Sequence, residues 1–342
     1  MRVRRALAAA LVLSAVAAGI AGCSAAPPAP FRVTGYASAG NTTTAQLLAS
    51  RKTMTMVGVD GVTLTPDGRG ITAVDEASLG LLHEAHRLHK TAELLVSNYS
   101  NTLGDFDPNL AATMLNSPAS RRSVIAALAN DVRSQGWNGI TIDLESLNNF
   151  GAAGHTRDDN AGLAAFTKEL RAALGKASIS ICLSATTGSY ADLGYDLPAL
   201  GASVDHVVLM AYDQHGPSWS SAGPIGGYPW AKATLRGLTR ELPAASIQLG
   251  IGEYGYSWPA GSVDGTPRGG GPYSDAAARA LVTRDHATAL WDATQLEWHA
   301  TLPDGTILWW SDARSFAARE ALARSLDLGG VAVWSLGQAD PL

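Results

Sequence analysis

The chain has 342 residues with a formal net charge of −5, and 16% of its residues are charged. An acidic chain without a basic block does not have the charge pattern of a nucleic-acid-binding protein, so we expect no nucleic-acid partner. Roughly 310 residues without a second linker follow the N-terminal segment, a length that is unusual for one domain but common for (β/α) barrels.

The N-terminus predicts a signal peptide over residues 1–22. Arginines precede an apolar run, residues 6–20, that is too short and wrongly flanked for a stable membrane span. An apolar N-terminal helix of the domain is the alternative. The run ends on "IAGC", which resembles the lipobox of bacterial lipoproteins and implies that Cys23 is lipidated. Residues 23–30 would then tether an extracytoplasmic domain to the outer face of the cell membrane, with the lipid as its only membrane contact.

Eight short apolar runs alternate with helix-period segments from residue 31 onward. The runs are "FRVTGYA", "TMTMVGVD", "AELLVSNY", "GITIDLES", "SISICLSA", "DHVVLMAYD", "IQLGIGEYGY" and "GGVAVWSLG". One helical segment places Ile125, Leu128 and Val132 on one face and ends at Gly136, and a second ends at Gly175. Eight such repeats predict an α/β fold, a (β/α)8 TIM barrel. An open doubly wound sheet is the alternative, but its Gly-rich phosphate turn is missing after the first strand.

A segment at approximately residues 257–312 interrupts this alternation. It is rich in Gly, Pro and aromatic residues, and Pro303, Asp304 and Gly305 separate two apolar runs, which indicates a hairpin. We therefore expect a small α+β insertion between strands seven and eight of a barrel that covers residues 31–342.

The fourth run, within "WNGITIDLESL", carries two carboxylates two residues apart. Side chains alternate along a strand, so Thr141, Asp143 and Glu145 share the face that points into the barrel. Glu145 falls at the C-terminal end of its strand, where barrel active sites are built. Two carboxylates roughly 6 to 7 Å apart repel one another, and a raised pKa suits one of them to be a general acid. A helix cap or a salt-bridged pair would explain the same residues, and the spacing alone does not decide.

"NGITIDLE" resembles the D-G-x-D-x-D-x-E signature of glycoside hydrolase family 18. "LMAYDQH" is similar to the family's M-x-Y-D segment, "EYGYSW" to its Y-G-Y segment, and "GGVAVWSLGQADP" to its last strand. The resemblance spans nearly all of residues 31–342. It looks closest to the subgroup of spore-germination enzymes that cleave peptidoglycan.

This resemblance implies that Glu145 is the catalytic acid/base and that Asp143 holds and polarises the substrate's N-acetyl group. Tyr212 would hydrogen-bond the acetamido oxygen, Asp213 would contact the same region, and Trp334 would form the floor under the sugar. The remaining substrate-binding positions that we expect are Met210, Thr141, Tyr254, Asn98 and Glu253.

The implied mechanism is retaining and substrate-assisted, and it requires neither a metal nor a cofactor. The signature is incomplete, because Asn138 and Thr141 replace its first two acids. Asp143 therefore lacks the neighbouring carboxylate that would share its proton, although Thr141 can donate one hydrogen bond. We expect the reaction to survive with a different pH optimum.

Other features have simpler interpretations. His83, His86 and His89 stand at three-residue spacing, but His86 and His89 continue a helical stripe and no carboxylate or cysteine completes a known pattern, so we expect no metal site. Cys182, in an apolar strand, is interpreted as a small buried hydrophobe rather than a nucleophile. Three tryptophans follow strand ends and are candidates for stacking on sugar rings or for loop packing: Trp219, Trp230 and Trp258.

The expected substrate is a polysaccharide that contains N-acetylglucosamine, cleaved at β-1,4 linkages by a monomer. Peptidoglycan is preferred because a lipid anchor would hold the enzyme beneath the cell wall, and chitin oligomers come second. One alternative is a catalytically inactive, lectin-like envelope lipoprotein, although such proteins usually lack the acid or its Asp. A second is an envelope scaffold that binds no sugar.

Overall fold

A computed structural model describes residues 30–148, 158–262 and 270–342. The predicted signal peptide, Cys23 and residues 24–29 of the tether lie outside the described residues. Within the described ranges, no helix is long and apolar enough to cross a membrane.

Eight parallel strands close into a barrel in the order β1-β15-β9-β8-β7-β6-β3-β2, and β1 pairs with both β15 and β2. The strands are β1 (Arg32–Ser38), β2 (Met56–Thr63), β3 (Thr91–Ser97), β6 (Gly139–Asp143), β7 (Ser178–Ser184), β8 (His206–Met210), β9 (Ile247–Gly252) and β15 (Gly330–Trp334). Each predicted run overlaps one of them. The (β/α)8 prediction is confirmed, and the open-sheet alternative is wrong.

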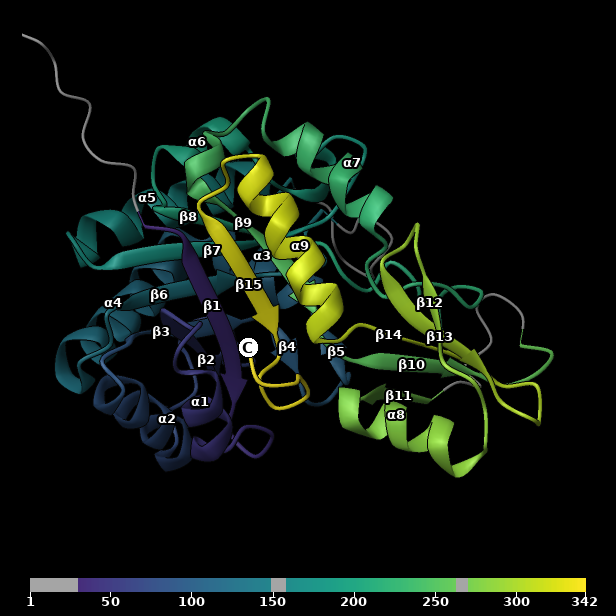
Figure 1. The fold of residues 1–342 in the computed structure, drawn as a ribbon. Coiled ribbons are helices and arrows are strands. Elements are labelled where there is room, and N and C mark those ends of the chain that lie inside the picture. The colour runs from purple at the N-terminus through teal and green to yellow at the C-terminus, as the bar shows by residue number, and fades with distance from the viewer. Residues whose placement is uncertain (1–29, 149–157, 263–269) are drawn as a thin grey trace, which may run out of the picture.

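Helices cover the outside of this barrel (Figure 1). They are α1 (Thr44–Ser50), α2 (Glu76–Arg87), α3 (Pro108–Leu115), α4 (Pro118–Gln135), α5 (Asn160–Leu174), α6 (Leu197–Gly201), α7 (Tyr228–Leu238) and α9 (Ala313–Ser325), with 3-10 turns at Ala191–Leu193 and Ala244–Ser246. Helix α4 begins after the Ser117 cap and ends at Gly136, whose φ of 89° suits glycine. The predicted stripes of α4 and α5 pack on the strands and form the core between the two layers.

The predicted insertion is an α+β lobe between β9 and β15. Its antiparallel sheet has the order β11-β10-β14-β13-β12, and α8 packs on one face of it. Its elements are β10 (Gly255–Trp258), β11 (Gly270–Tyr273), α8 (Asp275–Arg284), β12 (Leu290–Asp292), β13 (Glu297–Thr301) and β14 (Ile307–Trp310). The predicted hairpin joins β13 to β14 at Gly305, which has a φ of 83°. In Figure 1 the lobe projects from one side of the barrel.

A short hairpin, β4 (Tyr99–Ser100) and β5 (Asp105–Phe106), follows β3. Its aromatic side chains, Tyr99 and Phe106, meet edge to face with their ring centroids 5.6 Å apart. Because parallel strands present their C-terminal ends at one face of a barrel, this hairpin stands beside the residues that follow β6.

Candidate active site

The alternation expected along β6 is present. Ile140, Ile142 and Leu144 belong to the core between strands and helices. Thr141 and Asp143 face the barrel interior, and Glu145 lies two residues beyond the strand, at its C-terminal mouth.

The two carboxyl groups have different surroundings. Asp143 is 7% exposed, and its Oδ1 is buried without a hydrogen-bond partner, whereas Glu145 is half-buried. Burial raises the pKa of both groups. The pKa of Glu145 is well above its ordinary value, because Asp143 and then Asp213 add to the effect of burial. Glu145 therefore keeps its proton to a higher pH than an ordinary carboxyl group, as a general acid requires.

Asn98, directly after β3, fixes the backbone that carries Glu145. Its Oδ1 accepts from the Glu145 N–H at 2.8 Å, and its Nδ2 donates to the Glu145 carbonyl at 3.0 Å and to the Asp107 carbonyl at 2.9 Å. Its side chain is fully buried. The expectation that Asn98 contacts substrate is therefore corrected: its amide is used within the protein and holds Glu145 in place.

Two adjoining cavities, of about 330 and 120 Å³, open around these groups, and Glu145, Met210, Tyr212 and Asp213 line both. The larger one is completed by Ser184, Ala185, Gln214, Trp219 and Trp230. The smaller one is completed by Tyr36, Leu95, Phe106, Asp143, Cys182 and Trp334. Six predicted site residues thus converge: Asp143, Glu145, Met210, Tyr212, Asp213 and Trp334.

Tyr254 lies behind this surface. It is 2% exposed, and its hydroxyl donates to Asp213 Oδ1 at 2.6 Å. Tyr256 donates to the same oxygen at 3.0 Å. Tyr254 therefore supports Asp213, and the expected substrate contact of Tyr254 is corrected.

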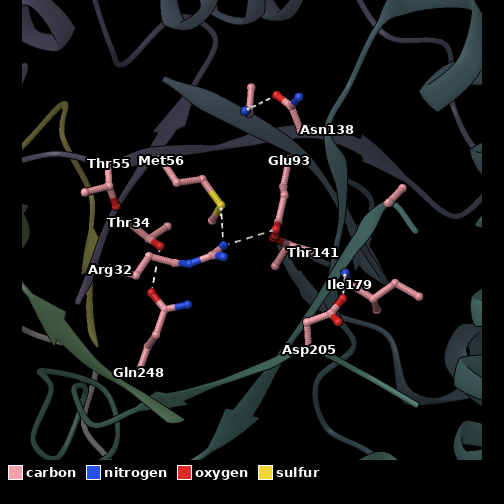
Figure 2. A network of polar contacts seen from close by, with 12 residues as sticks. Arg32, Thr34, Thr55, Met56, Glu93, Asn138, Thr141, Ile179, Asp205 and Gln248 are labelled. Atoms are coloured by element: carbon pink, nitrogen blue, oxygen red, sulfur yellow. Dashed lines mark hydrogen bonds and ion pairs between the residues drawn. The ribbon is translucent and has the colours of Figure 1, made fainter. Parts of the chain in front are cut away.

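Thr141 is fully buried below the cavities, and its hydroxyl donates to Glu93 Oε2 at 2.8 Å. Glu93 in turn faces Arg32 at 3.6 Å (Figure 2). The expected substrate contact of Thr141 is wrong, and so is the expectation that its hydroxyl serves Asp143, because that bond belongs to the polar network at the barrel floor. Asn138 lies before β6, at the opposite end from Glu145, where its Oδ1 accepts from Ala92 N at 2.7 Å.

Glu253 does not line the cavities either. It is fully buried after β9, and neither of its carboxyl oxygens has a hydrogen-bond partner. Burial raises the pKa of Glu253 well above its ordinary value, and Asp275 and Asp340 raise it further. The expected substrate contact of Glu253 is corrected.

The tryptophans divide between the two interpretations. Trp219 and Trp230 line the larger cavity, and Trp219 is 48% exposed at its rim. Trp258 is 2% exposed, and its indole N–H donates to the Ser220 carbonyl at 3.1 Å, so it packs the loop. His86 lies 3.0 Å from Asn138 Oδ1, and within the described ranges no group of three or more His, Cys, Asp or Glu could hold a metal ion.

The loop that follows β8 is tied to the lobe by a buried ion pair. Arg319 of α9 lies 2.9 Å from Glu297 of β13, and both are almost fully buried. Glu297 accepts from the N–H groups of Ile225 and Gly226 at 2.7 and 2.9 Å, and Arg319 donates back to the Gly226 carbonyl. This pair fixes the far end of the loop that carries Gln214 and Trp219 into the larger cavity.

Comparison with known proteins identifies the family. The profile described as "Glycosyl hydrolases family 18" matches residues 97–339, more than half of the chain, so the protein belongs to glycoside hydrolase family 18. The predicted family membership is confirmed, and the protein is a glycosidase.

Similar proteins include a glycosylase, a cortical fragment-lytic enzyme and a chitinase. The chain is 24% identical over 253 residues to the uncharacterized glycosylase YvbX of Bacillus subtilis, covering 71% of this chain and 70% of that protein. It is 27% identical over 265 residues to the cortical fragment-lytic enzyme of Bacillus subtilis, covering 73% of this chain and 58% of that protein. The structure of a chitinase from Chromobacterium violaceum matches with a TM-score of 0.78 and 25% identity, over 91% of this chain and 96% of that chain.

Proposed function

We propose that the protein is a retaining, substrate-assisted glycosidase that cleaves β-1,4 linkages after N-acetylglucosamine. The convergence of Glu145, Asp143 and Tyr212 on one cavity system carries this proposal. A carboxyl group whose pKa is raised by burial stands at the mouth, and a buried carboxyl group stands two residues before it.

In the proposed mechanism Glu145 protonates the glycosidic oxygen as that bond to the anomeric carbon breaks. The N-acetyl carbonyl oxygen attacks the anomeric carbon from the opposite face, and Asp143 and Tyr212 hold the acetamido group. Asp143, as the anion, stabilises the oxazolinium that forms. Glu145, now a carboxylate, takes a proton from a water molecule that attacks the anomeric carbon, and the bond to the N-acetyl oxygen breaks, which opens the oxazolinium ring. The two successive inversions at the anomeric carbon retain its configuration.

The charge of the lining supports an uncharged sugar as the ligand. Among the described residues, neither cavity is lined by lysine or arginine, whereas aromatic side chains stand at both. Trp334 and Tyr212 offer faces for a pyranose ring, and Trp219 offers another at the rim. A muramic acid unit whose carboxyl group is amide-linked to a peptide is neutral at that position and is compatible with this lining.

Peptidoglycan is the proposed substrate, and chitin oligomers are the second candidate. The names of the relatives support both, since one is a cortical fragment-lytic enzyme and another is a chitinase. The inactive, lectin-like alternative has no support in the site, because the acid and its neighbouring Asp both face the cavity.

Digestion of purified peptidoglycan and of N-acetylglucosamine oligomers tests this proposal. Reduction of the products followed by sugar analysis identifies the newly exposed reducing end, which we expect to be N-acetylglucosamine. NMR at early times should show the β-anomer first. Muramic acid at the reducing end, or the α-anomer first, would contradict the proposed specificity or mechanism.

We also propose that lipid on Cys23 anchors the enzyme to the outer face of the cell membrane, on the strength of the "IAGC" sequence alone. The protein should then fractionate with membranes in a bacterial host, and Cys23→Ala should move it to the soluble fraction. Equal fractionation of the two forms would contradict the anchor.

A further inference from the structure

Position 141 leaves Asp143 without the acidic neighbour that the full family signature has. The Thr141 hydroxyl does not replace that neighbour, because it donates to Glu93 in the barrel floor. Asp143 Oδ1 is buried with no hydrogen-bond partner, so the orientation of this carboxyl group depends on what stands beside it on the neighbouring strands.

Strand β7 places Cys182 beside Asp143. Thr141 is in register with Ser180, and both face the barrel interior, so the next inward residues, Asp143 and Cys182, are neighbours across the two strands. Both line the smaller cavity, and Cys182 is 4% exposed. Its Sγ lies 3.8 Å from the hydroxyl oxygen of Tyr36, which comes from β1.

The thiol acts on Asp143 in a defined direction. Burial and then the charge of Asp60 raise the pKa of Asp143, and the neighbouring Cys182 thiol lowers it. Burial and Asp143 itself raise the pKa of Cys182 well above its usual value. The sulfur therefore keeps its hydrogen across the working pH range and remains a donor.

We propose that Cys182 is a positioning residue of this glycosidase, whose thiol holds the Asp143 carboxylate from β7 in place of the acid that position 141 lacks. The inference rests on the proposed function, because it concerns the work assigned to Asp143 there. The titratable groups that bear on Asp143 come from several parts of the barrel: Asp60, Glu145, Cys182, Tyr195 and Tyr212. Of these, Cys182 and Tyr212 are the neutral donors that line the smaller cavity, and Cys182 is the one on β7, the strand that pairs with β6.

The pH profile of kcat/KM separates this role from simple packing. Cys182→Ala removes the donor and should move the acid limb, which reports ionisation of Asp143, upward by about 0.5 to 1 pH unit. Cys182→Ser keeps a donor and should restore the limb to within a fraction of that shift. Val208→Ala, which truncates another member of the same buried cluster, should leave it in place. An unmoved limb in Cys182→Ala, or an equal shift in Val208→Ala, would overturn the proposal.

A second measurement needs no turnover. The S–H stretching band of Cys182 can be isolated by subtracting the infrared spectrum of Cys182→Ser from that of the wild-type protein. Asp143→Ala should move this band to higher frequency, because the thiol loses its acceptor, and an unmoved band overturns the contact. Failure of the proposed function gives a different result: the band still shifts between the wild-type protein and Asp143→Ala, but the wild-type protein releases no product.

Discussion

At the scale of single residues, the proposed mechanism needs two carboxyl groups in opposite protonation states. In that mechanism Glu145 carries its proton when the leaving group departs, whereas Asp143 is ionised to stabilise the positive oxazolinium. The structure raises the pKa of both, through burial and through the neighbouring carboxyl groups. Activity therefore requires a pH above the Asp143 pKa and below the Glu145 pKa.

The pH dependence of kcat/KM should consequently be bell-shaped, with both limbs above the range of ordinary carboxyl groups. Activity falls as pH decreases because Asp143 takes up a proton, and it falls as pH increases because Glu145 loses one. Asp143→Asn should abolish the acid limb and lower kcat by about 10² or more. Initial rates on an N-acetylglucosamine oligomer between pH 4 and 10 measure this, and an acid limb that persists in Asp143→Asn would contradict the assignment.

Asn98 offers a second test at this scale. Asn98→Ala leaves the N–H and carbonyl groups of Glu145 without their hydrogen-bond partners. A buried polar group without a partner lowers the free energy of unfolding by about 1–3 kcal/mol. Because Glu145 then loses its fixed position, kcat should fall more than KM rises. Asn41→Ala removes an exposed amide that donates to the Ser38 hydroxyl and is the matched control. Equal kcat in the two variants would contradict the positioning role.

Strand alternation and strand polarity are enough to predict that Asp143 and Glu145 lie at one mouth of the barrel. The same patterns do not predict the roles of Asn98, Thr141, Tyr254 and Glu253, because alternation gives the face on which a side chain lies but not the partner to which its polar atoms bond. Tyr36 and Cys182 were missed as lining residues, although both lie at inward positions that the same alternation defines. Phe106 reaches the smaller cavity from the β4–β5 hairpin, whose two-residue strands are too short to give a hydrophobic pattern in the sequence.

At the scale of elements, the buried ion pair of Arg319 and Glu297 ties the lobe to the barrel and holds the loop that lines the larger cavity. Three segments far apart in sequence meet at Glu297 and Arg319: the loop after β8, strand β13 and helix α9. A helical stripe or an apolar strand pattern predicts each element separately. The pairing of two buried charges 22 residues apart depends on packing, so periodicity gave no indication of it.

Breaking the ion pair of Arg319 and Glu297 should lower the stability of the protein substantially. Arg319→Met leaves Glu297 as an unpaired buried charge, which typically costs about 3–5 kcal/mol. Arg284→Met, which breaks an exposed pair with Asp285, should cost at most about 1 kcal/mol. Urea unfolding of the two variants gives the comparison, and KM should rise only in Arg319→Met as the loop that bears Trp219 loosens. Equal stability losses would contradict the account.

At the scale of the whole molecule, the barrel, the lobe and the chain end meet around buried acids. Asp275 begins α8, is fully buried, and accepts from the Asp340 N–H at 2.9 Å, while its own N–H donates to the Gln338 carbonyl. Burial raises the pKa of Asp275 to about 8, and the pKa of the nearby Glu253 is also raised. Both groups are thus protonated in the folded protein at pH values where an unfolded chain has released these protons.

Stability should therefore decrease as pH rises from about 4, the unfolded carboxyl pKa, to about 8. The folded state binds more protons in this window, so each added pH unit favours the unfolded chain. Asp275→Asn keeps the acceptor for Asp340 without the titration and should reduce the slope. Thermal unfolding across this range, wild-type beside variant, measures the effect, and a wild-type Tm that increases steadily toward pH 8 would contradict it.

We propose above all that this family 18 barrel hydrolyses N-acetylglucosamine polymers through Glu145. The most direct test is release of reducing ends from N-acetylglucosamine oligomers and peptidoglycan by the wild-type protein and by Glu145→Gln, with oligomer binding to both followed by calorimetry. We predict turnover by the wild-type protein, a loss of about 10² to 10⁴ in kcat for Glu145→Gln, and retained binding in that variant. Binding by both proteins with product from neither, or equal turnover by the two, would contradict the claim.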